Sequence, residues 1–166
     1  MASIPRRRKV AGDRLGGYIY GTIIVLATLV AGAEAYRNGA GHIAILVLIT
    51  TFVFWLAHVY SHVLAHSVAA GHKPTAAEVV KIAHREDSII EAAILPVTML
   101  VLGKLDVFSV HAAIWLAFAC GIGVLVGEGV RYAKAESLGV LGTATVVTAN
   151  VVMGLLLVAL KLWVSH

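Results

Sequence analysis

The sequence predicts an all-α membrane protein, a bundle of five transmembrane helices with a cytoplasmic N-terminus and a C-terminus outside. Of its 166 residues, 60% are hydrophobic and only 13% are charged, and the mean hydropathy is +0.90. A soluble domain carries about 25% charged residues. Several apolar runs also exceed the roughly 18 residues that mark a membrane-spanning helix. Composition and run length therefore predict a multi-pass protein in a lipid bilayer.

Five spans are expected after a basic tail over residues 1–14, within a single transmembrane domain over residues 15–166. Between the second and third spans, Thr75 and Glu78 form a T-x-x-E capping box, which predicts an amphipathic cytoplasmic helix over residues 75–87. Pro96 is expected to kink the third span, whose purely apolar part is only about fifteen residues long. The spans are expected at about 15–35, 42–69, 84–102, 109–132 and 138–163.

The distribution of basic residues sets the expected orientation, because cytoplasmic loops carry an excess of Lys and Arg. With five spans, ten basic residues lie inside and three outside. If the third segment failed to cross, both ends would lie on one side and this bias would weaken. We therefore prefer five spans, and we expect the plasma (inner) membrane of the cell as the location. The inner set is Arg6, Arg7, Arg8, Lys9, Arg14, Lys73, Lys81, Arg85, Arg131 and Lys134, and the outer set is Arg37, Lys104 and Lys161.

Several classes of protein are excluded by what the sequence contains. A single cysteine, Cys120, cannot form a disulfide within the chain, which excludes a disulfide scaffold. The net charge of +4 is concentrated in the run 6–9 before the first span, so it indicates orientation and not nucleic-acid binding. The sequence has no Ser-His-Asp set, P-loop or nucleotide fingerprint. We therefore expect no enzyme and no nucleic-acid partner.

Small residues indicate where helices approach closely. Gly17 and Gly21 in the first span, and Gly123 and Gly127 in the fourth, have the G-x-x-x-G spacing. Packing within one bundle is the simpler interpretation, and a homodimer through these Gly/Ala-rich faces is the alternative. Asn150 in the fifth span is expected to form an interhelical contact.

Histidines form a ladder in the second span. His58, His62 and His66 are each four residues apart and so lie on one helix face. Two imidazoles at i and i+4 can reach one metal ion. The outer two are about 12 Å apart along the axis, so all three do not share one ion easily. The ladder is suited either to a metal site or to proton transfer.

The predicted topology brings further polar groups to the same cytoplasmic half of the membrane. Glu91 is expected about two turns inside the third span, where a charge must be neutralised, paired or bound to a cation. We expect His58, His62 and Glu91 to bind Fe²⁺, Mn²⁺ or Zn²⁺. The alternative is that they form only interhelical hydrogen bonds. A cytoplasmic mouth or proton path is expected from His66, His84, Glu86, Asp87, Glu128 and Arg131.

The members of that mouth have simpler interpretations too. His66 and His84 lie where headgroup contact is an ordinary role, and Glu128 with Arg131 has the spacing of a helix-end ion pair.

The first span contains Arg14-Leu15-Gly16-Gly17-Tyr18-Ile19-Tyr20-Gly21 and Leu29-Val30-Ala31-Gly32, and a helical extension follows the second of five spans. In these features the chain resembles the vacuolar iron transporter family of proton-coupled divalent-metal carriers. The resemblance implies transport of a divalent metal. The family's intramembrane aspartate falls on Tyr20 here, so no site residue is carried over. The segment 54–62 is similar to small membrane proteins of actinobacteria, which implies no activity.

Three functions remain open from the sequence. The first is a transporter or channel for a divalent cation or protons, and the second is a structural or accessory subunit of a membrane complex. The third is a haem or metal cofactor protein. Bis-histidine haem needs imidazoles on two facing helices, whereas the intramembrane histidines here lie nearly all on one.

Overall fold

The computed structural model describes residues 6–36 and 39–164, and no strand is found in that part of the chain. Side chains are described for residues 12, 14–36, 39–157, 159 and 163. The helices are α1 (Arg6–Ala35), α2 (Ala40–Ala70), α3 (Ala76–Arg85), α4 (Ser88–Glu91), α5 (Ile94–Lys104), α6 (Val110–Ala135) and α7 (Val140–Val164).

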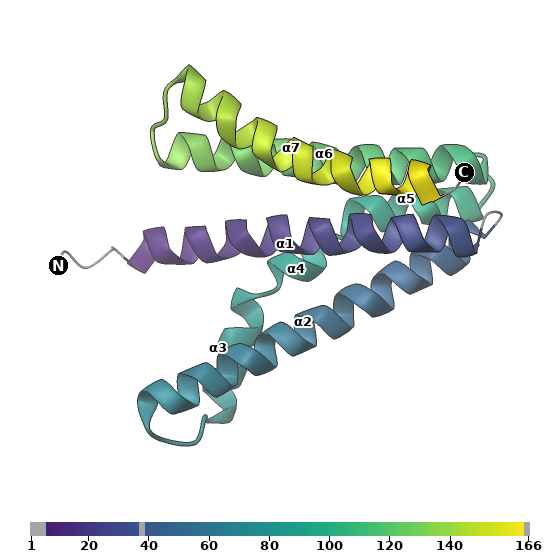
Figure 1. Ribbon diagram of the computed structural model, residues 1–166. Helices are drawn as coiled ribbons and strands as arrows, with labels where there is room; N and C mark the ends of the chain where they lie inside the picture. The colour runs from purple at the N-terminus through teal and green to yellow at the C-terminus, as the bar shows by residue number, and fades with distance from the viewer. Residues whose placement is uncertain (1–5, 37–38, 165–166) are drawn as a thin grey trace.

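Four of these helices are long and apolar enough to cross a membrane, namely α1 from Arg14 onward, α2, α6 and α7. This confirms the prediction of an all-helical chain suited to a bilayer. Figure 1 shows α1 near the centre, with α6 and α7 on one side and α2 on the other. The end of α1 and the start of α2 lie at the same end of the bundle, and α2 diverges from α1 toward the opposite end.

The segment predicted as a third span over residues 84–102 is divided among α3, α4 and α5. Pro96 has no N–H to donate to the carbonyl of Ala92, and its ring crowds that carbonyl. The helix is interrupted there, and the N–H of Ala93 bonds to the carbonyl of Ile90, only three residues back. The kink expected from Pro96 is therefore a break. A second break lies between Arg85 and Ser88, and α5 by itself is shorter than a membrane span.

The core lies between α1, α2, α5 and α6. The opposite, outward faces of the long helices carry large apolar side chains, of which Ile49 is 58% and Tyr60 63% exposed. Such surfaces are suited to lipid and costly in water. The fully buried side chains of the core include Val25, Leu26, Leu29, Ile43, Val47, Leu100 and Leu125.

The first glycine pair forms the contact between α1 and α4. A Cβ at Gly21 would lie 2.6 Å from the carbonyl oxygen of Ile89, and one at Gly17 would meet the side chain of Ser88. Gly123 and Gly127 differ, because a Cβ at either position would meet nothing within 4 Å. The first pair therefore packs within the chain, and a dimer through the second pair stays a prediction.

Asn150 joins α7 to α6 from a buried position. Its Nδ2 donates a hydrogen bond to the carbonyl of Leu125 over 3.1 Å. It lies against Gly129, whose lack of a side chain leaves room for the amide.

Candidate metal centre

Two histidines of α2 face one buried carboxylate. His58 and His62 are one turn apart, and their ring centroids are 4.7 Å apart. Nε2 of His58 lies 3.6 Å from Oε2 of Glu86, and Nδ1 of His62 lies 2.9 Å from Oε1 of the same carboxylate. Only 4% of the Glu86 side chain is exposed. The structure therefore brings a carboxylate to the histidine pair from another segment of the chain.

Glu86 reaches this position because the chain bends there. It ends α3, and its N–H bonds to the carbonyls of Ile82 and Ala83. The backbone then turns at Asp87 before α4 begins. Because the bend stops the helix at Glu86, the side chain points back between α1 and α2.

The three side chains are spaced as donors to one ion would be. One ligand atom from each of His58, His62 and Glu86 lies within 4.8 Å of the other two. Donors that bind Zn²⁺ at about 2.1 Å are about 3.4 Å apart in a tetrahedral site, so small ring rotations suffice to close the set. Two imidazole nitrogens and a carboxylate oxygen suit Zn²⁺, Fe²⁺ or Mn²⁺.

Three buried polar atoms without a hydrogen bond in the described part of the chain lie together at this cluster, namely Nδ1 of His62, Nε of Arg85 and Oε1 of Glu86. Although 2.9 Å apart, Nδ1 of His62 and Oε1 of Glu86 have no hydrogen bond of acceptable geometry within the described residues. Buried polar atoms are normally hydrogen-bonded, and leaving one unbonded is costly. A cation bound to both atoms would satisfy both.

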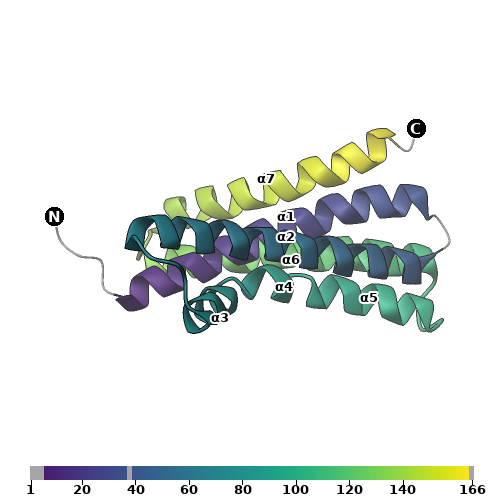
Figure 2. The same ribbon diagram turned by 90° about the horizontal axis from the view of Figure 1, so that it is seen from below.

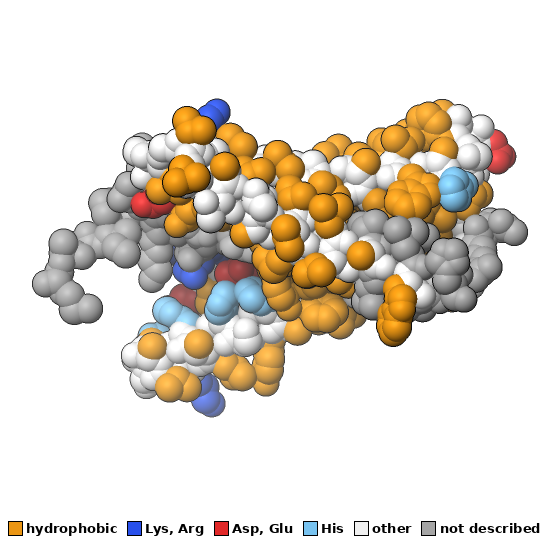
Figure 3. All heavy atoms as spheres, turned by 45° about the horizontal axis from the view of Figure 1, so that its top comes forward, with side chains coloured by type: hydrophobic (Ala, Val, Ile, Leu, Met, Phe, Trp, Pro, Cys, Tyr) orange, Lys and Arg blue, Asp and Glu red, His pale blue; other side chains and the backbone are white. Residues whose placement is uncertain are grey.

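A cavity of about 350 Å³ adjoins the cluster. On the α1 side it has three glycines, which leave space because they have no side chains, together with Tyr20. The Tyr20 ring lies 5.3 Å from the His58 ring. Figure 3 shows histidines and acidic and basic side chains gathered beside the hydrophobic surface at one end of the molecule. The cavity residues are Gly12, Gly16, Gly17, Tyr20, His58, His62, Arg85 and Glu86.

Arg85 is a further charged neighbour of the carboxylate. Its Nε lies 3.6 Å from Oε1 of Glu86, and its side chain is 40% exposed. The guanidinium therefore partly balances the buried negative charge. Neither Arg85 nor Tyr20 was identified as a cavity residue from the sequence, because no spacing signal connects them to the histidines.

Glu91, expected as the third ligand, lies elsewhere. Both oxygens of its carboxylate accept hydrogen bonds from Nη2 of Arg14, at 3.0 and 2.9 Å, and Tyr18 also donates to it. The expectation assumed one continuous helix through residues 84–102. The bend after Glu86 turns Glu91 toward α1, so Glu86 is the carboxylate at the histidines.

Three residues of the predicted mouth, His66, His84 and Asp87, form two separate pairs near the cluster. His66 Nε2 lies 3.4 Å from Glu78 Oε1, and His84 Nδ1 lies 3.0 Å from Asp87 Oδ2. The capping box is confirmed, because Thr75 and Glu78 exchange both of its hydrogen bonds. Bonds from the Thr75 backbone N–H and hydroxyl, then from His66, lower the pKa of Glu78 to about 2, so this carboxylate is ionised at neutral pH.

The remaining predicted mouth residues lie on the other side of α1. Arg131 donates to Glu128 over 2.6 Å, with Glu128 buried and Arg131 exposed. The Arg131 guanidinium also lies 5.9 Å from the centroid of the Tyr18 ring. The predicted mouth thus separates into a histidine group at α2 and α3 and a group of ion pairs around Tyr18.

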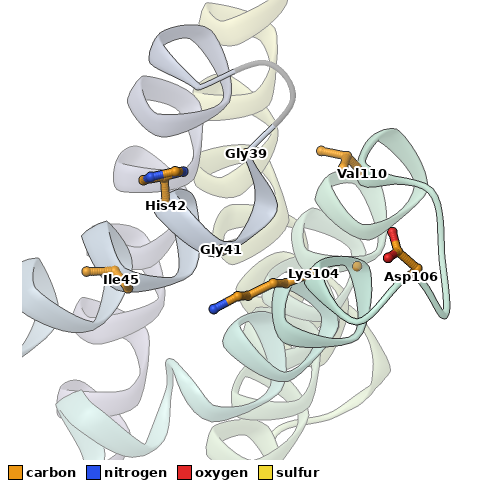
Figure 4. Close-up of a pocket in the computed structure, with 8 residues that line it drawn as sticks. Gly39, Gly41, His42, Ile45, Lys104, Asp106 and Val110 are labelled. Atoms are coloured by element: carbon orange, nitrogen blue, oxygen red, sulfur yellow. The ribbon is translucent and has the colours of Figure 1, made fainter.

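A second cavity, of about 300 Å³, lies at the other end of the molecule between the start of α2 and the turn from α5 to α6. Figure 4 shows His42, Lys104 and Asp106 at this cavity pointing in different directions. Among the residues that the structure describes, no ligand set converges there as it does at Glu86.

Comparison with protein-family models, curated proteins and solved structures gives no match.

Proposed function

We propose that this chain is a small membrane transporter or channel for a divalent cation, with His58, His62 and Glu86 as its binding site. The observation that carries the proposal is the buried Glu86 carboxylate, which faces two imidazoles without a well-formed hydrogen bond to either. Fe²⁺, Mn²⁺ and Zn²⁺ are the ions that this donor set favours.

The position of the cluster along α2 supports movement of an ion and not merely its storage. We place the start of α2, at Ala40, at one edge of the apolar layer, which is about 30 Å thick. At 1.5 Å per residue, His62 lies about 33 Å farther along the helix. The cluster therefore lies near the other edge of the layer, beside a cavity. Toward the edge at Ala40, Val25, Leu29 and Val47 are fully buried and fill the space between the helices. We propose that the structure represents a state in which the cluster is open to one side of the membrane only. Passage of the ion then requires α2 to move against α1.

Five crossings, with the N-terminus in the cytoplasm and the C-terminus outside, complete the proposal. Residues 88–104 of α4 and α5 span about 25 Å as helix, nearly the apolar layer. The start of α1 and the end of α7 lie at opposite ends of the bundle in Figure 1, which supports an odd number of crossings. The plasma membrane is the proposed location.

Protons are a second candidate for the transported ion, because further histidines pair with carboxylates near the cluster. Besides the cluster, His66 pairs with Glu78 and His84 with Asp87, so His–carboxylate pairs follow one another at this end of the molecule. Imidazoles change charge near neutral pH and can pass protons along such a row.

Flux into sealed proteoliposomes tests the function. Vesicles containing a metal-sensitive dye or a pH dye are exposed to Fe²⁺, Mn²⁺ or Zn²⁺, or to a pH step. We expect metal entry above that of empty vesicles, and at least tenfold less entry with Glu86→Gln. Glu136→Gln, an exposed carboxylate after α6, is the control and should retain the wild-type rate. Flux of neither metal nor protons would exclude transport and favour an accessory subunit.

A further inference from the structure

Helix α3 has an unusual orientation and no buried residue. Figure 1 and Figure 2 show it running across the direction of the long helices. None of its residues from Ala76 to Arg85 is buried. The long helices pack along one another, so a short transverse helix at their end is not a further span.

The two faces of α3 differ in character. At 100° per residue, Ala76, Val79, Val80 and Ala83 lie within an arc of about 100°. The Val80 side chain is 55% exposed. The other face carries Glu78, Lys81, Ile82 and Arg85, which line a cavity of about 230 Å³ with His66 of α2, and Lys81 is itself exposed. The helix therefore turns this face toward α2 and its apolar stripe (76, 79, 80 and 83) away from it.

The level of α3 along the bundle indicates what lies against that stripe. Glu86, the residue after α3, contacts His62, which is near the edge of the apolar layer. The apolar stripe of α3 therefore lies at the level of one surface of the bilayer.

Charge adds a second argument for lipid. Lys73 precedes α3 and Lys81 lies on it, and both are exposed. Of the nearby acids, Glu78 accepts the capping hydrogen bonds and Asp87 pairs with His84. Lysines beside an apolar stripe at a membrane surface are arranged to meet anionic headgroups.

We propose that α3 is an interfacial helix whose apolar stripe enters the adjoining lipid leaflet, while Lys73 and Lys81 contact the phosphates of anionic lipids. The bilayer then holds α3 at a fixed depth and, through the bend at its end, presses Glu86 against His58 and His62. The lipid contact does not depend on whether the cluster binds an ion.

Collision accessibility of spin labels tests the position of α3. In a Cys120→Ala background, Val80→Cys and Lys81→Cys are labelled with a nitroxide in full-length protein in nanodiscs. We expect the label at 80 to collide several-fold more with oxygen, which concentrates in lipid, than with a water-soluble nickel chelate, and the label at 81 to show the reverse. A label at 80 that collides mainly with nickel would overturn the proposal and favour water or a soluble partner at the stripe.

Comparing two lipid compositions tests the contact with lipid headgroups. Because anionic headgroups attract lysines at the membrane surface, we expect the label at 80 to lie deeper in nanodiscs with 30% anionic lipid than in purely zwitterionic ones. Lys73→Gln with Lys81→Gln should abolish that difference, and Lys134→Gln at the end of α6 should keep it. Equal depth of the wild-type label in both lipids would overturn the phosphate contact.

Discussion

At the scale of single residues, the charge on Glu86 decides how the cluster behaves. The carboxylate is nearly buried and has three neighbours able to carry positive charge, namely His58, His62 and Arg85. Removing a carboxylate from water is costly unless it is paired or bound to a cation. A divalent ion at this place would therefore compete with the guanidinium of Arg85 for the same oxygen.

Arg85→Gln is expected to tighten metal binding. The substitution removes a positive charge close to the incoming ion, and with Arg85 partly exposed we expect a gain of about three- to tenfold in affinity. Titration against a competing chelator at pH 7.5 in detergent measures it. Lys134→Gln, which removes an exposed charge far along the chain, is the control. Unchanged or weaker binding by Arg85→Gln, in protein that unfolds at the wild-type temperature, would contradict this competition.

The sequence predicted two of the three residues of the cluster. A spacing of four on a helix predicted that His58 and His62 share a face, because helix geometry is local. It could not distinguish Glu86 from Glu91, because the choice depends on a bend between α3 and α4. No Gly or Pro marks that bend in residues 85–88.

At the scale of elements, the contact between α1 and α4 holds the chain after the bend in place. Gly21 lies against the backbone of Ile89, with 2.9 Å from an added Cβ to its Cα. The ion pair between Arg14 and Glu91 joins the same two helices. Since α4 directly follows Glu86, this contact also fixes the carboxylate of the cluster.

Gly21→Ala is expected to destabilise the protein by about 1–3 kcal/mol, because the contacted atoms belong to backbone and cannot turn aside. Gly127→Ala adds the same methyl group on another helix, where nothing lies within 4 Å. The unfolding temperature of this variant should be unchanged or slightly higher than that of the wild type. Thermal unfolding in one detergent compares the two variants. If Gly21→Ala unfolds at or above the temperature of Gly127→Ala, the tight packing of α1 on α4 is wrong.

Local sequence signals predicted element boundaries where the chemistry is local. The capping box at Thr75 and the effect of Pro96 both act within one turn, so both could be predicted from the sequence. The arrangement of the long helices could not be predicted. Their apolar side chains surround most of the helix, so no polar stripe tells which face meets a neighbour and which meets lipid.

At the scale of the whole molecule, the proposed crossing by residues 88–104 determines which loops share a side. We expect that single cysteines at His72 and Ser137, in a Cys120→Ala background, react with a membrane-impermeant maleimide only after the cells are opened. A cysteine at Asp106 is expected to react in intact cells. If positions 72 and 106 are labelled from the same side, α4 and α5 do not cross and the chain has four spans.

The proposed function requires that the cluster of His58, His62 and Glu86 binds a metal ion. Counting bound ions tests that requirement most directly. Protein stripped with a chelator and reloaded with Fe²⁺, Mn²⁺ or Zn²⁺ is analysed for metal by mass spectrometry. We expect one ion per chain, its loss in the double variant His58→Ala/His62→Ala, and its retention in His42→Ala/His111→Ala, which removes two exposed histidines. No stoichiometric metal in the wild type, or full metal in the first double variant, would contradict the account.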